Sequence, residues 1–469
     1  MSKKVTLIMP CYNAEPYIDV MLSSVYSQIH DDIELICVDD GSTDCTRAKL
    51  DAWKPLMEKR GYTMIIVSKS NGGSSSAINA GLGLITGEYV CFPDADDMLM
   101  SGYVSEMLEY LETHSDEKWV MCDTLEAKDT PEFPPLIVRS ESYSDWMDYN
   151  FKYLVEHFLA FRVYWSVWKL MIRTDFLRQC IPTMQIEESP FIQEPQINLP
   201  LAYGAPLAYL DKPLYLYFSR KEGITLKNHG AGYAKAMAYS QDACYDVALK
   251  TLDKLDASIE QKTKWHQVID IWFNLKCFQL ATGYQEDTEK ARFAQKQLKL
   301  ISHVLGDEIS EKLINAQSSY ALWFYSECAL DKLIYAHHNI VPFTDESKRK
   351  VFENLKNRRI FLYGAGEVGR SLLPALIYVG IKPEGIWDTN AELNGTYLLE
   401  VPISTPDLTQ ITSIEKAGIT VILCIQKREF CEEAEALLSS NGMTNIIQPD
   451  DLVKMLRAAI LDINIKSLT

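Results

Sequence analysis

The sequence lacks a long apolar run, a paired-cysteine motif and an excess of basic residues, and each absence excludes a class of protein. No uncharged apolar stretch approaches the eighteen residues that predict a membrane-spanning helix. Lys and Arg number 46 against 64 Asp and Glu, and the net charge of −18 argues against a general nucleic-acid binder, because a polyphosphate would be repelled. The eleven cysteines form no CxxC pair and no metal-ligand spacing, so they are expected to be reduced, buried thiols.

The start of the chain has too few apolar residues for a secretion signal, because two lysines are followed by only five apolar or small residues before Pro10. This pattern predicts a cytoplasmic protein and leaves open peripheral attachment at the inner face of a membrane. The length of 469 residues and the hydrophobic content of 47% predict a globular chain with two or three domains. Whether the chain forms a homo-oligomer is left open.

Apolar runs and helical spacing divide the chain into three predicted domains. Four apolar runs are expected to form strands, at residues 5–9, 33–38, 64–67 and 89–92. Because segments with helical spacing separate these runs, we predict an α/β fold with a doubly wound, mostly parallel sheet in a first domain, 1–226. Long helical stretches predict a helical linker domain over 227–350, and a strand followed by GxGxxG predicts a Rossmann-like α/β domain over 351–469.

Three carboxylates in four residues, Asp94-Ala95-Asp96-Asp97, close the last of these apolar runs. Like charges this close repel one another and resist burial unless a cation or a donor compensates them. At a strand end such a cluster favours a hard divalent cation, Mg²⁺ or Mn²⁺, which usually brings substrate phosphates with it. For such a cluster seen in isolation, the alternative interpretation is a solvated acidic turn.

Two more strand ends carry side chains that suit a nucleobase. The first predicted strand ends at Pro10 and Tyr12, and the second ends at Asp39 and Asp40. Ligands of such sheets bind beyond the carboxyl ends of the strands, so a ring that stacks and a carboxylate that accepts from an N–H group are expected side by side. A glycine- and serine-rich loop around Gly73 then runs into a helix, and its backbone can lie close to a ligand. Asp39 is also explained as a turn former.

The motifs MPCYNAEPYI, ELICVDDGSTD, NGGSSSAINAGL and GEYVCFPDADDML follow one another over about a hundred residues and together resemble glycosyltransferase family 2. That family contains inverting enzymes of GT-A fold that use nucleotide-diphosphate sugars. The resemblance implies that Tyr12 and Asp40 contact the base, with Asp39 adjacent. It also implies that Asp94 and Asp96 form the DXD pair, with Asp94 near the ribose and Asp96 on a metal that bridges the diphosphate.

The resemblance continues more weakly to about residue 226. Trp168 and Lys169 precede a helix-like segment as in the family, and they are candidates for sugar stacking and for a charge contact with phosphate or acceptor. Trp168 is equally explained as a core residue. Where family members often carry arginine this chain has Ile78, so no phosphate contact is predicted there. The predicted substrate-contacting set is Pro10, Tyr12, Asp39, Asp40, Gly73, Asp94, Ala95, Trp168, Lys169 and Arg220.

The position of the catalytic base departs from the family pattern. The family places its base in a Glu-Asp pair at a helix start, and here the corresponding pair is Glu194-Pro195. Proline cannot accept a proton, although it suits the first turn of a helix. Glu194 remains beside it, where the helix dipole favours a carboxylate. We therefore predict Glu194 as the base, with Glu187 or Glu188 as further candidates and a changed or absent transferase activity as the alternative.

The C-terminal region, 351–469, carries a dinucleotide fingerprint in its usual context. The strand RIFLY precedes Gly364, Gly366 and Gly369, a helix pattern follows, and Asp388 lies about twenty residues beyond the glycines. This pattern predicts a Rossmann-like module with NAD(P) or another nucleotide as its candidate ligand. It resembles small modules found beside sugar-nucleotide enzymes of surface-polysaccharide pathways, for which a binding or assembly role is expected.

The leading interpretation is a metal-dependent inverting glycosyltransferase that moves a sugar from a nucleotide-diphosphate donor, UDP being favoured, to a glycan or lipid-linked acceptor in surface polysaccharide synthesis. One alternative is a non-catalytic nucleotide-sugar-binding protein, which Pro195 and Ile78 motivate. The other is a transferase fused to an NAD(P)-dependent module.

Overall fold

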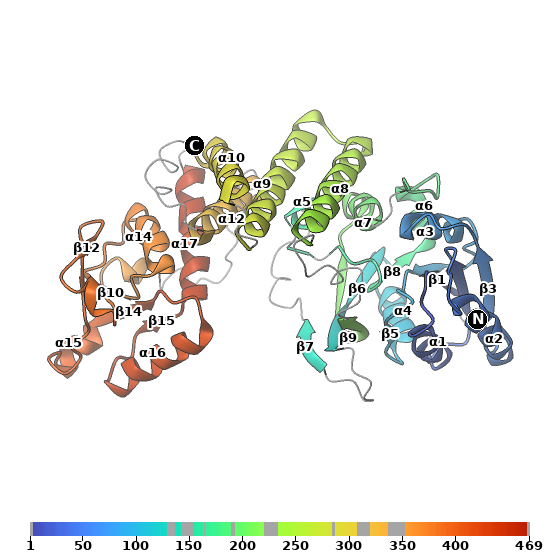
Figure 1. Cartoon of the computed structure of the whole chain (residues 1–469), viewed down its shortest axis with the longest axis horizontal. Helices are drawn as coiled ribbons and strands as arrows, with labels where there is room; N and C mark the ends of the chain where they lie inside the picture. Colours follow the sequence, from blue (N-terminus) through green and yellow to red (C-terminus); the bar gives the residue numbers. More distant parts are fainter. Residues whose placement is uncertain are drawn as a thin grey trace. The chain divides into compact units, whose positions relative to one another are not determined.

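The computed structural model describes residues 3–128, 137–141, 154–160, 162–163, 165–188, 193–219, 233–283, 287–306, 319–335 and 352–466. Its internal contacts divide the chain into two units, Met1–His266 and Gln267–Thr469, each of which is described by itself (Figure 1). The boundary falls inside one long helix, α9 (Ile259–Gly283). The division into domains at residues 226 and 350 stays a prediction.

The described part of the first unit is an α/β structure built on a nine-stranded sheet. Its strands are β1 (Val5–Cys11), β2 (Ile33–Asp39), β3 (Thr63–Ser68), β4 (Tyr89–Cys91), β5 (Met98–Leu99), β6 (Trp119–Lys128), β7 (Ile137–Glu141), β8 (Leu170–Arg173) and β9 (Ala208–Ser219). Its helices, before α9, are α1 (Ile18–Tyr26), α2 (Thr46–Arg60), α3 (Ser74–Leu82), α4 (Tyr103–Thr113), α5 (Leu154–Leu159), α6 (Thr174–Cys180), α7 (Glu194–Gly204) and α8 (Tyr233–Lys254).

The sheet is parallel where the sequence predicts it and mixed beyond. Its order is β3-β2-β1-β4-β8-β6-β9-β5, with β7 paired to β6. Strands β3, β2, β1 and β4 run parallel, whereas β8 is antiparallel to both β4 and β6. The predicted α/β fold is therefore confirmed, and the predicted mostly parallel sheet is a mixed sheet.

Helices cover both faces of the parallel strands. Alternate residues of a strand face opposite sides, and Leu7 and Met9 of β1 share one core with buried residues of α1, α2 and α4. Ile8, between them, faces α3, where a Cβ added to Gly81 would lie 2.5 Å from its Cγ2. The close approach of α3 thus requires glycine. Strands β1, β2 and β4 are buried as their continuous apolar runs predict, whereas β3, at the edge of the sheet, is partly exposed.

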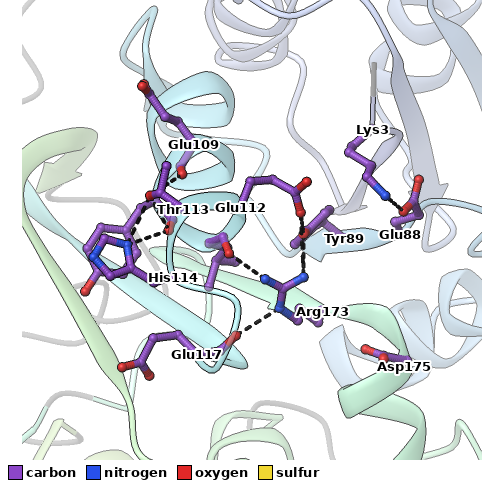
Figure 2. Close-up of polar contacts among 12 residues, drawn as sticks. Lys3, Glu88, Tyr89, Glu109, Glu112, Thr113, His114, Glu117, Arg173 and Asp175 are labelled. Atoms are coloured by element: carbon purple, nitrogen blue, oxygen red, sulfur yellow. Dashed lines mark hydrogen bonds and ion pairs between the residues drawn. The ribbon is translucent and has the colours of Figure 1, made fainter. Parts of the chain in front are cut away.

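The amino-terminal ends of the strands are held by a charged network, which Figure 2 shows. The Arg173 guanidinium, at the end of β8, donates to the Tyr89 hydroxyl at 2.6 Å and to the Glu117 carbonyl at 2.9 Å. The Tyr89 hydroxyl donates to Glu112 of α4, and Lys3 donates to Glu88 (Figure 2). This network fixes the start of β4, whose other end leads into the acidic cluster.

The described part of the second unit contains the rest of α9, further helices and a six-stranded sheet. The helices are α10 (Asp287–Leu305), α12 (Ser319–Tyr335), α14 (Glu367–Tyr378), α15 (Ser413–Gly418), α16 (Arg428–Ser440) and α17 (Pro449–Lys466), with a short 3-10 helix η4 (Ala391–Leu393). The strands are β10 (Arg359–Tyr363), β11 (Gly385–Trp387), β12 (Tyr397–Leu398), β13 (Val401–Ser404), β14 (Ile419–Leu423) and β15 (Ile446–Ile447).

This second sheet has the order β12-β13-β11-β10-β14-β15 and is parallel except for the β12–β13 pair. Helix α12 packs against α10, α14 and α17. Arg457 of α17 pairs with Asp331 at 2.7 Å and with Glu327 at 3.0 Å, both on α12. Within the described ranges, no helix is long and apolar enough to cross a membrane.

Candidate active site

The carboxyl ends of β1 and β2 lie level with each other, because Cys11 pairs with Asp39 in the parallel register. Tyr12, which follows β1, is 51% exposed, so its ring is open to stacking, and Pro10 is half-buried. Asp39 is buried and accepts the Ser42 N–H at 3.0 Å, which is the turn role that the sequence left open.

Asp40 lies at this edge with its carboxylate turned onto the glycine-rich loop. It is 3% exposed and accepts the backbone N–H groups of Gly72 at 3.1 Å and Gly73 at 2.7 Å, while Lys69 Nζ donates to it at 2.6 Å. Gly73 has a φ of +85°, which favours glycine. Asp40 therefore shapes the loop that begins α3, and its predicted contact with a base stays a prediction.

The acidic cluster divides into two kinds of carboxylate. Asp97 is 1% exposed and accepts from the Tyr215 hydroxyl and from the Phe218 N–H, both at 3.0 Å. The Tyr215 hydroxyl in turn accepts the Asp94 N–H at 3.1 Å, so Asp97 and Tyr215 hold the turn against β9. Asp97 is thus a structural carboxylate, which the sequence could not separate from its neighbours.

Asp94 and Asp96 are half-buried on either side of buried Ala95. Burial, and then the negative charges of Asp97, Asp96 and Glu194, raise the pKa of Asp94 well above its ordinary value. A divalent cation beside Asp94 and Asp96 would relieve this repulsion, so the two residues suit the metal that the DXD pair predicts. In the described parts of the chain, no group of three or more His, Cys, Asp or Glu side chains is arranged to hold a metal.

Glu194 begins α7 and lies close enough to Asp94 for the two charges to interact. Burial raises the pKa of Glu194 to about 7, although backbone N–H groups of Glu194 and Gln193 act in the opposite direction. The predicted base therefore lies within electrostatic range of Asp94, one of the two predicted metal ligands. A carboxylate with a pKa near 7 can accept a proton at neutral pH.

The two fallback candidates for the base lie just before α7. Glu187 pairs with Lys250 at 3.0 Å and Lys254 at 3.3 Å, and its hydrogen bonds with these lysines lower its pKa, which makes it a poor base. Glu188 is exposed and accepts from the Ser76 hydroxyl at 3.1 Å.

Trp168 and Lys169 lie beside the same edge but differ in exposure. The half-buried Trp168 ring stacks on Tyr215 with 4.4 Å between centroids and lies parallel to Tyr217 at 5.9 Å. Lys169 is 0% exposed, with Nζ 5.6 Å from the Trp168 ring centroid, so the structure does not present it at the surface. Arg220 lies outside the described residues.

Several residues that connect the loop of α3 to the start of α7 were not predicted. Asn79 exchanges two hydrogen bonds of 2.8 Å with the backbone of Ile186, and Ser74 Oγ donates to Gln193 at 2.6 Å. These contacts join segments more than one hundred positions apart. Such pairs leave no local pattern, and the serine-rich composition of the loop is the one signal that points to them.

The C-terminal fingerprint residues also come together, at the loop between β10 and α14. Gly364 has a φ of +110°, and a Cβ added there would lie 2.9 Å from the Cys424 carbonyl. A Cβ added to Gly369 would lie 2.2 Å from the Gly364 carbonyl, whereas one added to Gly366 would meet open space. Backbone packing therefore explains Gly364 and Gly369 without a ligand.

The Asp388 carboxylate accepts hydrogen bonds from the backbone around this loop. Its two oxygens accept the N–H groups of Ala365 at 2.6 Å and Asn390 at 2.8 Å. In the fingerprint this carboxylate would bind a ribose hydroxyl, but here it ties the glycine loop to the end of β11. The three glycines thus keep the turn, backbone-approach and packing roles of the fingerprint, whereas Asp388 already accepts from the loop in place of a ribose.

Comparison with known proteins agrees with the geometry of the first unit. Residues 6–171 match the model of glycosyltransferase family 2. An uncharacterized glycosyltransferase of Haemophilus influenzae is 39% identical over 108 residues, which are 23% of this chain and 32% of that protein. TuaG of Bacillus subtilis, a putative teichuronic acid biosynthesis glycosyltransferase, is 36% identical over 107 residues, 23% of this chain and 41% of that protein.

The N-terminal region therefore carries a glycosyltransferase family 2 domain, and the chain spans about a third to two-fifths of the length of these two relatives. Among solved structures, residues 1–349 of S. aureus TarS in complex with UDP-GlcNAc match with a TM-score of 0.44 and 18% identity, over 71% of this chain and 91% of that one.

Proposed function

We propose that the chain is a metal-dependent inverting glycosyltransferase that moves a sugar from a nucleotide-diphosphate donor, UDP being favoured, to a hydroxyl of a glycan or lipid-linked acceptor. The observation that carries the proposal is Glu194, a carboxylate with a pKa of about 7 whose charge acts on Asp94 of the half-buried Asp94-Ala95-Asp96 turn. This supports a proton acceptor near the proposed site for a cation and a diphosphate.

In the proposed reaction Glu194 takes the proton of the acceptor hydroxyl. The oxygen then forms a bond to the anomeric carbon of the donor, and the bond from that carbon to the diphosphate breaks with its electron pair on the diphosphate oxygen. Asp96, with Asp94, would hold a Mg²⁺ or Mn²⁺ ion that neutralises the charge of the leaving diphosphate. Tyr12 offers an exposed ring on which the base can stack.

The class of product that we propose is inferred from the names of the relatives. TuaG is named for teichuronic acid biosynthesis, and this chain shares with it 107 aligned residues within the family domain. Surface polysaccharide synthesis is therefore the pathway class that we propose. For the second unit we propose a Rossmann-like module with a binding or assembly role, because its sheet is mostly parallel and Asp388 serves the loop itself. No step of the transfer is assigned to it.

A screen of nucleotide sugars with Mn²⁺ or Mg²⁺, scored for transfer and for slow hydrolysis, tests the proposal. Wild type is expected to turn over at least one donor, and Glu194→Gln is expected to lower kcat by about 10²- to 10⁴-fold, as removal of a general base does. Glu188→Gln is the matched comparison. If Glu188→Gln lost the activity and Glu194→Gln kept it, the base would be Glu188. Donor binding without turnover by wild type would favour a non-catalytic nucleotide-sugar-binding protein.

A further inference from the structure

One chain of hydrogen bonds joins the glycine- and serine-rich loop to Glu194. The Ser74 hydroxyl, at the start of α3, donates to Gln193 Oε1 at 2.6 Å. Gln193 Nε2 then donates to Glu194 Oε1 at 3.2 Å. Because Ser74 occupies the amide oxygen, the amide NH₂ group is turned toward the carboxylate. Gln193 is 8% exposed, so water has little access to replace either bond.

Further hydrogen bonds hold α3 and the first turn of α7 in fixed positions relative to each other. Asn79 of α3 exchanges two hydrogen bonds with Ile186, and Gln196 of α7 exchanges two with the backbone of Glu187 at 2.6 and 2.9 Å. The strand–helix loop that presents Gly73 and the first turn of α7 are therefore bound to the same short segment, 186–188. A shift of the loop would be transmitted to Gln193 and to the carboxylate it contacts.

We infer that Gln193 is a positioning residue for Glu194 and that Ser74 sets the orientation of the Gln193 amide. The amide N–H on Oε1, together with the backbone N–H groups of Gln193 and Glu194, restrains the orientation of the carboxylate, which keeps lone pairs to accept the proton of the acceptor hydroxyl. The loop that would lie along the donor is thereby coupled to the base that serves the acceptor. This inference rests on the proposed function, because it assigns Gln193 to the reaction of Glu194.

The side chain of Gln193 can be altered in two ways that separate packing from hydrogen bonding. Gln193→Glu keeps the shape and an acceptor for Ser74 but places an oxygen, instead of an NH₂ group, against Glu194. Gln193→Met removes both bonds. We expect Gln193→Met to lower kcat by about 10- to 100-fold, and Gln193→Glu by at least as much, with the KM for the donor sugar within about twofold of wild type.

Ser74 provides the second arm of the test. Ser74→Ala is expected to lower kcat by about tenfold, and Ser74→Thr, which keeps the hydroxyl, is expected to restore it. The double variant Ser74→Ala/Gln193→Met should be no slower than Gln193→Met, because residues that act through one chain are not additive. Gln297 is a buried glutamine of the second unit, whose amide donates to the Ile271 carbonyl and to the Ser326 hydroxyl. Gln297→Met is the control, with reduced thermal stability and an unchanged kcat.

The outcomes are distinguishable. If Ser74→Ala raises the donor KM and leaves kcat unchanged, Ser74 contacts the donor directly and the inference is wrong. Additive losses in the double variant, or an unchanged kcat in Gln193→Met, also overturn it. If wild type neither transfers nor hydrolyses any nucleotide sugar, the proposed function fails first and the inference fails with it, before any variant is compared.

Discussion

The two edges of the sheet in the first unit differ in how fully their acidic side chains are compensated. At the amino-terminal edge Glu34 accepts from the Thr6 and Thr86 hydroxyls and from the Thr86 N–H, and Glu88 pairs with Lys3. At the carboxyl edge burial and like charges raise the pKa of Asp94 and burial raises that of Glu194 to about 7.

The difference shows which acidic residues stabilise the folded state and which destabilise it. A buried carboxylate that accepts several hydrogen bonds has its desolvation offset, whereas neighbouring carboxylates without a bound cation raise the free energy of the folded state. Glu34 at the first edge and Asp97 at the second are thus structural, whereas we propose that Asp94 and Glu194 at the second edge are poised for a ligand that brings positive charge. Four predictions test this contrast, from the largest expected effect to the smallest.

The largest effect is expected on metal-dependent nucleotide binding. Asp96→Ala should weaken UDP binding in the presence of Mn²⁺ by about 100-fold or more, because the diphosphate loses its bridge to the protein. Isothermal titration calorimetry with UDP, with and without Mn²⁺, measures this. Glu88→Gln, at the opposite edge, is the matched control and should bind UDP like wild type. Equal, metal-independent binding by wild type and Asp96→Ala would contradict the assignment.

The second prediction concerns stability against pH in the metal-free protein. Because the pKa of Glu194 is raised in the folded state, this group lowers stability as the pH rises from about 4.5 to about 7. At about 1.4 kcal/mol for each pKa unit, the full cost is about 3 kcal/mol. Glu194→Gln should therefore increase the free energy of unfolding at pH 8 by up to about 3 kcal/mol, and by much less at pH 5. Urea unfolding with EDTA at both pH values measures it, and an equal gain at both would rule out ionisation as the cause.

The third prediction addresses the amino-terminal edge. Arg173→Met removes the donors to Tyr89 and to the Glu117 carbonyl, and should lower the free energy of unfolding by about 2 kcal/mol, because buried acceptors lose their partners. Arg178, whose side chain donates to the Ile85 carbonyl at 3.2 Å, serves as the comparison, and Arg178→Met should cost less. UDP binding should persist in both variants, and its loss in Arg173→Met would show that the two edges are not independent.

The smallest effect is expected where the acidic turn is fastened to β9. Tyr215→Phe removes the hydroxyl that accepts from the Asp94 N–H and donates to Asp97. We expect a loss of about 1 kcal/mol in stability and a loss of a few-fold in Mn²⁺-dependent UDP affinity. Urea unfolding and calorimetry measure both. A loss of affinity as large as that of Asp96→Ala would mean that Tyr215 contacts the ligand itself.

The strand ends could be predicted from the sequence because each is marked locally, by an apolar run followed by polar residues. Parallel pairing then gathers Tyr12, Asp40 and Asp94 at one edge without further information. The position of Glu194 at a helix start was predicted from the family resemblance, and α7 begins at that residue. What could not be predicted was how each carboxylate is satisfied. Asp97 and Tyr215 are separated by 118 positions, and their hydrogen bond leaves no pattern in either segment.

The glycine motifs show the same limit. Gly364 and Gly369 are required by the close approach of backbone atoms, so the fingerprint reports a tight strand–loop–helix turn before it reports a ligand. Asp388 has the predicted spacing, yet its oxygens accept from the loop itself. Lys169 was predicted as a contact for phosphate or acceptor, and the fold buries it completely. Spacing in the sequence does not distinguish a residue that binds a ligand from a residue whose side chain is already used within the fold.

Helix α7 has a consequence for how the site is assembled. It is eleven residues long and contains Pro195 and Pro200, neither of which can donate a backbone hydrogen bond. A helix this short is marginal in water even without proline, so α7 depends on tertiary contacts such as that of Asn198 with the Trp165 carbonyl. Glu194 should therefore reach its place late in folding, after the sheet has formed. A partly folded chain would then have the strand ends that carry Tyr12 and Asp40 before it has Glu194 in place.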